Sequence, residues 1–287
     1  MNSQPAPGPA YFAADTDPAV LIPTRWALGS WSADQVHGMA VCGALARGAE
    51  LALAEHGRAD LHPVRIAVDM FAPVRMQPIR WTTDIVRDGS RLCLIDVALL
   101  QDDRRVARAA VTFVKPSEAA PGHTWNPTVA PTPPSPDLAP ESERPRIPFF
   151  RSTSDWSQDI PTHQNADRKE SWSTPIPVVV GEKPSGFQSA AAVADGASML
   201  TNWGTAGVGY INSDVTLALT REPTGYQIGL SAIDRVESAG AMVGTVRMFD
   251  RQGTFGSVLI TAISNAKRAI DFTSRGFPGT RRRDRPE

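Results

Sequence analysis

Cysteine is scarce in this sequence. The 287 residues contain only Cys42 and Cys93, which are too few for a disulfide framework and lack the spacing of a metal site. The N-terminal segment MNSQPAPGPA has neither the basic stretch nor the apolar core of a signal peptide. No apolar run approaches the ~18 residues that a membrane span needs. These absences predict a reduced, cytoplasmic protein without a membrane span.

The sequence also lacks an excess of charge of either sign. Its 29 Lys and Arg residues and 30 Asp and Glu residues leave a net charge of −1, so no overall attraction favours nucleic acid as a partner. The only basic cluster, TRRRDR at 280–285, is typical of a solvated tail. The hydrophobic content of 41% and the length are those of a globular protein with one large domain or two ordinary ones.

Proline, in contrast, is concentrated in one segment. Ten of the 25 prolines lie between Pro116 and Pro148. Because proline has no backbone N–H and a fixed φ, such a segment cannot form a regular helix or a central strand. Residues 116–149 are therefore predicted to be an extended surface linker between two halves.

Each half shows the same order of elements, a long helix followed by four strands. Alternating apolar residues and tight turns predict the strands, and capping residues and glycine mark the ends of the helices. The helices are expected at 37–57 and 185–203, and the strands at 64–71, 79–86, 91–101 and 105–114, then at 211–219, 226–237, 241–250 and 256–266. A repeat offset by ~150 residues indicates duplication and an α+β architecture. The predicted units are 1–115 and 150–272, with a basic tail at 273–287.

Three stretches resemble a known family. GEKPSGFQSAAAVADGASML at 181–200 is similar to the motif G-E-x-P-[S/T]-x-x-Q followed by A-x-x-D, FAPVRMQPIRW at 71–81 resembles a strand-and-turn motif, and the region from Trp31 to His37-Gly38 also matches. The family is that of the double-hotdog acyl-CoA thioesterases (type II, TesB-like), and the resemblance covers about residues 20–115 and 150–270. It implies two hotdog units, each a long helix wrapped by a curled antiparallel sheet. It also implies hydrolysis of a hydrophobic acyl-CoA without a metal or cofactor, and it favours a homo-oligomer, although one chain already contains a pair of units.

The resemblance implies a catalytic role for Asp195, an acid inside an Ala-rich helix. In the family, such an acid holds the attacking water together with a threonine and a glutamine from neighbouring strands. Asn212 falls at the position of the threonine and Thr261 at that of the glutamine, so this sequence departs from the family at both. The chemistry agrees with a base at Asp195, because burial raises the pKa of a carboxylate toward the range of a general base.

Substrate contacts are predicted for Gln188, His37 and Gly38. Gln188 lies on one helical stripe with Asp195 and Asn202, at a spacing of seven residues. The same spacing would mark the solvated face of an ordinary helix. His37 opens the first helix, where a histidine can also be purely structural.

Other functions have less support in the sequence. There is no G-x-S-x-G motif of an α/β-hydrolase, and no histidine near Asp195 supplies the partner that a hotdog dehydratase would use. The missing glutamine leaves a second hypothesis open, a double hotdog that binds acyl-CoA without cleaving it or serves as a structural partner. In an enzyme, the N–H that polarises the thioester carbonyl is expected from 31–38 or from 204–209.

Overall fold

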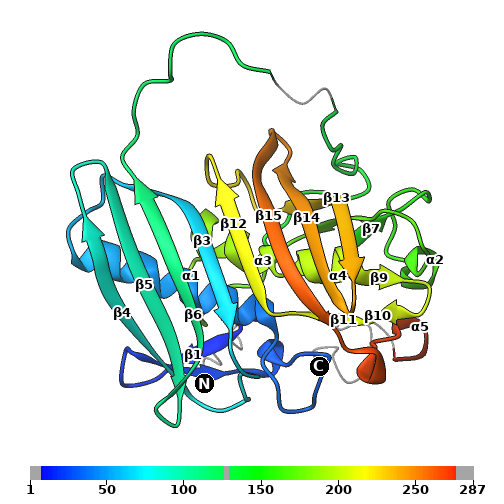
Figure 1. Ribbon diagram of the computed structural model, residues 1–287, viewed down its shortest axis with the longest axis horizontal. Coiled ribbons are helices and arrows are strands. Elements are labelled where there is room, and N and C mark those ends of the chain that lie inside the picture. Colours follow the sequence, from blue (N-terminus) through cyan, green and yellow to red (C-terminus); the bar gives the residue numbers. More distant parts are fainter. Residues whose placement is uncertain (1–7, 126–128, 276–287) are drawn as a thin grey trace, which may run out of the picture.

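The fold consists of one large antiparallel sheet with the long helices on one side (Figure 1). The computed structural model describes residues 8–125 and 129–275. The strands before the linker are β1 (Phe12–Ala14), β2 (Val20–Pro23), β3 (His62–Met70), β4 (Ile79–Asp88), β5 (Leu92–Gln101) and β6 (Arg104–Val114). Those that follow are β7 (Phe149–Arg151), β8 (Glu170–Ser173), β9 (Trp203–Gly204), β10 (Gly207–Val208), β11 (Tyr210–Asn212), β12 (Asp214–Leu219), β13 (Ile228–Ser238), β14 (Ala241–Asp250) and β15 (Gly253–Ser264).

Thirteen of these strands form the sheet in the order β1-β2-β4-β5-β6-β3-β12-β15-β14-β13-β8-β7, with β11 paired to β15, while β9 and β10 form a separate hairpin. The helices are α1 (Gly38–Glu55), α2 (Ile160–His163), α3 (Gly186–Ala194), α4 (Gly196–Asn202) and α5 (Phe272–Arg275). None of the helices in the described residues is both long and apolar enough to cross a membrane.

The first half has the predicted order of one long helix and four strands. The side chain of His37 caps α1, and the chain leaves the helix at Gly57 with φ 75°, as expected for a C-terminal glycine. Asp102 and Asp103 join β5 to β6 with φ values of 50° and 58°. Two positive φ values match the twist of a two-residue hairpin turn.

The second half differs from the prediction in its helix. A single helix was expected at 185–203, but the helix is broken at Asp195, which ends α3 and precedes α4. The next residue is Gly196, where a Cβ atom would lie 3.1 Å from Leu230 Cδ1 of β13. The glycine therefore lets the break pack closely against the sheet.

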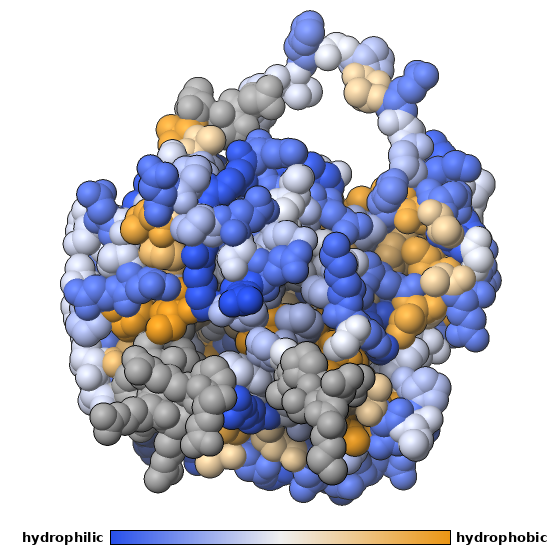
Figure 2. Space-filling view, turned by 180° about the vertical axis from the view of Figure 1, so that it is seen from behind, coloured by the Kyte–Doolittle hydropathy of each residue, from blue (hydrophilic) through white to orange (hydrophobic). Residues whose placement is uncertain are grey.

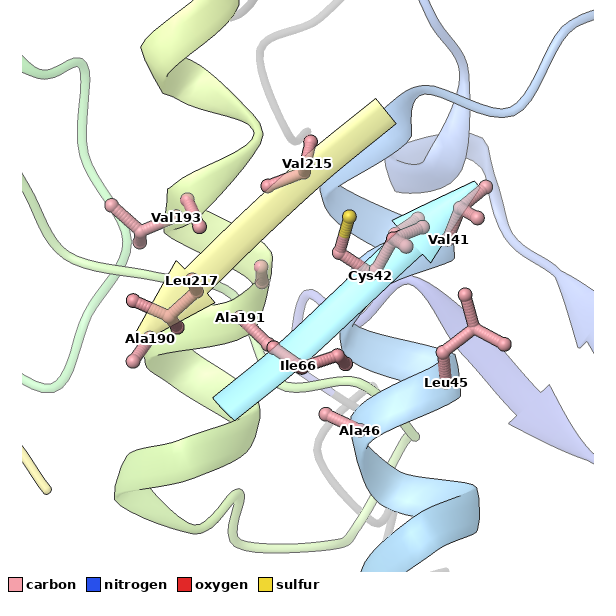
Figure 3. Packing of buried hydrophobic residues seen from close by; sticks show 14 of the residues in the cluster. Val41, Cys42, Leu45, Ala46, Ile66, Ala190, Ala191, Val193, Val215 and Leu217 are labelled. Carbon is pink, nitrogen blue, oxygen red and sulfur yellow. The ribbon is translucent and has the colours of Figure 1, made fainter. Parts of the chain in front are cut away.

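The two halves are joined through both the sheet and the helices. Strands β3 and β12 pair antiparallel, with Ile66 opposite Leu217, so the sheet is continuous across the halves. Behind this seam α1 packs on α3 through small side chains (Figure 3). A Cβ atom on Gly43 would lie 3.0 Å from Val178 and 3.5 Å from Ala192, so the absence of a side chain there permits the close approach.

The linker departs from the predicted surface segment in its second part. Residues 116–125 arch away from the body of the molecule (Figures 1 and 2). Further along, Ala139 is fully buried in a small cluster with Phe149, Trp172 and Phe249. Arg251 fixes the linker, donating to the carbonyl oxygen of Ala139 at 2.6 Å. A proline-rich segment without strands or helices can thus pack against the rest of the fold when side chains donate hydrogen bonds to its carbonyl oxygens.

Candidate active site

A cavity of about 1340 Å³ lies where the two halves meet. Its walls come from the N-terminus of α1, the break between α3 and α4, β11, the end of the linker at 144–148 and the segment after β8. The walls are mostly apolar, and the volume exceeds the usual range of ~300–1,000 Å³ for small-ligand pockets. The cavity is therefore suited to a long ligand with an extended apolar part.

Asp195 enters this cavity beside the N-terminus of α1. A Cβ atom on Gly38 would lie only 2.2 Å from Asp195 Oδ1, so the carboxylate occupies the space that the missing side chain leaves. Asn212, at the end of β11, donates from Nδ2 to the same oxygen at 3.0 Å. Burial raises the pKa of Asp195 to about 6, while hydrogen bonds from Asn212 and from the backbone of Met39 limit the rise. The result is a base that titrates close to neutral pH.

His37 holds the end of α1 in place at this point. Its Nδ1 accepts a hydrogen bond from the N–H of Ala40 at 3.3 Å, so the proton is on Nε2, which lies 3.2 Å from the carbonyl oxygen of Trp26. Burial lowers the pKa of His37 to about 4, and the ring is therefore neutral at pH 7. His37 lines the cavity, but both its nitrogens are already engaged.

The first residue of α1 also offers a backbone donor, since the N–H of Met39 is bonded to Asp195 and that of Ala40 to His37. The N–H groups at the start of a helix have no partner within the helix, and the aligned peptide dipoles make this end positive. Gly38 lies in the cavity wall at this position. A backbone donor beside a raised-pKa carboxylate is an arrangement that can bind a carbonyl oxygen and activate a water next to it.

Two family models match the chain. The acyl-CoA thioesterase N-terminal domain matches residues 27–114, and the acyl-CoA thioesterase C-terminal domain matches residues 127–258. The chain belongs to the acyl-CoA thioesterase family. It is a thioester hydrolase. No curated protein sequence matches this thioesterase.

Several solved structures share its fold. A protein assigned as a thioesterase II from Thermobifida fusca is 13% identical, with a TM-score of 0.63 over 88% of this chain and 94% of the other. The tesB protein of Mycobacterium avium subs. paratuberculosis is 15% identical, with a TM-score of 0.58 over 85% and 92%. A protein from Alicyclobacillus acidocaldarius described as having a hot dog fold is 16% identical, with a TM-score of 0.60 over 88% and 95%. The thioesterase therefore has the hotdog fold.

Two of the predicted site residues do not join Asp195. The hydroxyl of Thr261 hydrogen-bonds to the carboxylate of Asp214 and, at 3.0 Å, to Ser213, and Thr261 is not part of the cavity wall. Gln188 is not part of it either, since its Nε2 donates to Glu50 of α1 at 2.7 Å. The predicted water contact at Thr261 and the predicted substrate contact at Gln188 are therefore at odds with where these side chains lie. Asn212, His37 and Gly38 do lie with Asp195.

Tyr11 is a cavity residue that the sequence analysis missed. It is buried, lines the cavity and packs the edge of its ring against His37, with centroids 5.0 Å apart. Burial, and then the charge of Asp195, raise the pKa of its hydroxyl, so it remains a neutral donor. Tyr11 precedes all predicted elements and sits in a proline-rich segment, where no periodicity indicates burial.

Proposed function

We propose that this thioesterase hydrolyses a hydrophobic acyl-CoA to the free acid and CoA, with Asp195 as the general base. The observation that carries the proposal is the position of the Asp195 carboxylate, against the N-terminus of α1 inside a large apolar cavity. The apolar walls favour a hydrophobic acyl group, because burying apolar surface is favourable. Charged residues such as Arg25 and Arg144, which also line the cavity, are suited to the polar part of the substrate.

In the proposed reaction, the oxygen of a water attacks the thioester carbonyl carbon while Asp195 accepts a proton from that water. The tetrahedral intermediate then expels the CoA sulfur, so that a C–O bond forms and the C–S bond breaks. The proton held by Asp195 is released to the thiolate. Asn212 keeps the carboxylate oriented through its Nδ2, and its amide oxygen is available to accept from the water.

The carbonyl oxygen is proposed to lie at the N-terminus of α1, where Gly38 contributes its N–H. Backbone donors at such a position stabilise the negative charge that develops on the oxygen, an effect worth about 3–4 kcal/mol per donor in other hydrolases. Of the two regions considered from the sequence, this is the one that adjoins Asp195. The hairpin at 203–208 contributes only Val208 to the cavity wall.

We further propose that the chain is a double hotdog, with units at 1–115 and 150–272, a linker at 116–149 and a basic tail at 273–287. The support is the matching order of elements in the halves and the β3–β12 pairing that joins them. Of the proposed tail, residues 276–287 lie outside the described residues. In this arrangement, one helix supplies the base and the other supplies the backbone donor.

Release of free thiol from a series of saturated acyl-CoA esters tests the function. Hydrolysis by the purified protein, lost in Asp195→Asn and retained in Asp214→Asn, is the expected result. Asp214 is the matched control because it is also partly buried and raised in pKa by burial, yet lies outside the cavity wall. Acyl-CoA binding without thiol release by the parent protein would instead support the alternative, a non-catalytic acyl-CoA-binding protein.

A further inference from the structure

One part of the cavity wall carries several hydroxyl groups in apolar surroundings. Ser171 and Ser173 of β8, Thr174 just after it, and Ser198 of α4 all line the cavity. Ser171, Thr174 and Ser198 are only 3%, 6% and 7% exposed. The neighbouring parts of the wall are apolar, and include Phe150, Ile176, Met199 and Leu230.

Within residues 8–125 and 129–275, Thr174 Oγ1 is fully buried without a partner, and the hydroxyls of Ser171, Ser173 and Ser198 make no hydrogen bond to the protein. Other hydroxyls on the neighbouring elements do make hydrogen bonds within the protein. Thr201, one turn further along α4, donates to the carbonyl oxygen of Ala197 at 2.7 Å, and Ser231 of β13 donates to Glu170 at 2.7 Å. Buried polar side chains in proteins are nearly always paired, so a group of unpaired hydroxyls in one cavity wall indicates a ligand that pairs them.

The hydroxyls lie just beyond the proposed base. The N–H of Ser198 donates to the carbonyl oxygen of Asp195 at 3.1 Å, which places Ser198 one helical turn further along. Ser171 lies directly opposite Leu230 in the sheet, and Leu230 in turn approaches Gly196, the residue next to Asp195. Directly opposed residues of neighbouring strands project on the same face. The acyl chain of a substrate held at Asp195 would therefore pass this wall.

A plain alkyl chain is a poor match for such a wall. It would displace water from the hydroxyls and offer no hydrogen bond in return, and unpaired buried polar groups are costly. Sites built to bind a hydroxyl discriminate strongly against ligands that lack it, for this reason. Serine and threonine hydroxyls both donate and accept, so they pair equally well with a hydroxyl or a keto oxygen.

Building on the proposed function, we propose that the preferred substrate carries a hydroxyl or keto oxygen on its acyl chain, bound by Ser171 and Ser198 together with Ser173 and Thr174. These residues determine specificity, and the chemical step belongs to Asp195. An oxygenated acyl-CoA is thus favoured over a saturated one of the same length. A reaction that hydroxylates or incompletely reduces an acyl chain would supply this substrate.

The test compares octanoyl-CoA with octanoyl esters that carry a hydroxyl or keto group at different positions along the chain. At least one oxygenated ester is expected to show a kcat/KM about tenfold above that of octanoyl-CoA. Ser171→Ala and Ser198→Ala should each lower kcat/KM for that ester about three- to tenfold, and so reduce its preference over octanoyl-CoA. Ser257→Ala, an exposed serine on β15, is the matched control and should alter neither.

The proposal is overturned if octanoyl-CoA is preferred over every oxygenated ester, or if both serine variants affect all the esters alike. Thermal melting of each variant checks that the near-isosteric change leaves the fold intact. Binding to Asp195→Asn separates this proposal from the proposed function. If no ester is hydrolysed, the proposed function fails, while a lower Kd for the oxygenated esters would still establish the preference.

Discussion

Burial of the Asp195 carboxylate is energetically costly, and the same burial underlies its proposed role as a base. The fold breaks a helix at this residue, places its carboxylate in an apolar cavity and provides one side-chain donor, Asn212. Burying a carboxylate with so few partners is unfavourable. The same burial brings its pKa to about 6, where it can accept a proton and still be ionised at neutral pH.

Asp195→Asn is therefore expected to separate activity from stability. The amide preserves the shape but cannot accept the proton, so the hydrolysis rate should fall roughly 10²–10⁴-fold. The free energy of unfolding at pH 7 should rise, by up to about 3 kcal/mol from the shift in pKa. Steady-state thiol release and urea unfolding of parent and variant measure the two effects, and a variant that is as active as the parent would exclude Asp195 as the base.

The pH dependence has opposite signs for activity and stability. Activity of the parent should rise as the pH increases through about 6, because only the ionised carboxylate is a base. The pKa of Asp195 is higher in the folded state than the ordinary 3.8, so its contribution to stability is complete below pH 4 and is lost as the pH rises through about 6. The free energy of unfolding of Asp195→Asn, relative to that of the parent, should increase between pH 4 and pH 7. If the difference between the two proteins does not change with pH, Asp195 does not have the raised pKa.

Any side chain at Gly38 is expected to lower the catalytic activity. In Gly38→Ala the new Cβ would lie 2.2 Å from Asp195 Oδ1, so the carboxylate must move. Alanine is a better helix former than glycine, and α1 should remain intact. We expect a loss of kcat of about 10²-fold or more, whereas Gly209→Ala, with nothing within 4 Å of the added Cβ, should keep full activity.

At the scale of elements, α1 and α3 are bound to each other by a polar contact at the end away from the cavity. Glu50 of α1 accepts hydrogen bonds from Gln188 Nε2 at 2.7 Å and from Ser185 Oγ at 2.9 Å. Burial raises the pKa of Glu50, and these two donors oppose the rise. The carboxylate thus depends on α3 for its hydrogen bonds.

Gln188→Ala should lower stability without lowering activity. Losing a donor to a largely buried carboxylate costs about 1–3 kcal/mol, and Gln188 is not part of the cavity wall. The double variant with Glu50→Gln should recover part of the loss, because no charge then needs the donor. Urea unfolding and KM are the measurements, and an increase in KM at unchanged stability would restore the original prediction that Gln188 binds substrate.

Thr261 shows which features of the structure could be predicted from the sequence and which could not. The order of helices and strands follows from apolar periodicity and turn residues, and it is largely observed. Along β15, however, Ile260 and Ala262 are buried, whereas Thr261 and the apolar Ile263 are not. Apolar residues therefore occupy both faces of the strand, and a one-residue uncertainty in register moves a side chain to the opposite face. The motif singled out Asp195 from the sequence alone, but the contact of Asp195 with Gly38 depends on the packing of two helices that are distant in the sequence.

At the scale of the whole molecule, the linker is held by one side chain in particular. Arg251 donates to the carbonyl oxygens of Pro134 and Ala139, at 2.9 and 2.6 Å, and stacks on Trp172. A proline-rich segment has few backbone donors of its own, so its order depends on donors supplied by the sheet.

Arg251→Ala should release the second part of the linker. We expect a loss of about 1–3 kcal/mol in the free energy of unfolding and faster tryptic cleavage after Arg146, which lies just beyond the anchored segment and is followed by Ile147. Arg247→Ala serves as the control, since it removes only a bond to the carbonyl oxygen of Val129 near the exposed arch. Equal cleavage rates in the two variants would show that the linker is held by its apolar contacts instead.

The antiparallel pairing of β3 with β12 has a consequence for how the protein is made. The first half leaves the ribosome with an unpaired sheet edge at β3 and with the small-residue face of α1 uncovered. Both surfaces stay exposed until β12 and α3 have been synthesised. At about 5–20 residues per second, the ~150 residues between matching elements take roughly 10–30 s to synthesise. During that interval the nascent chain presents an aggregation-prone edge. This is the stage of synthesis at which binding by a ribosome-bound chaperone would protect the chain for longest. Since the carboxylate and the helix end that it meets come from opposite halves, hydrolytic activity can report when synthesis and docking of the second half are complete.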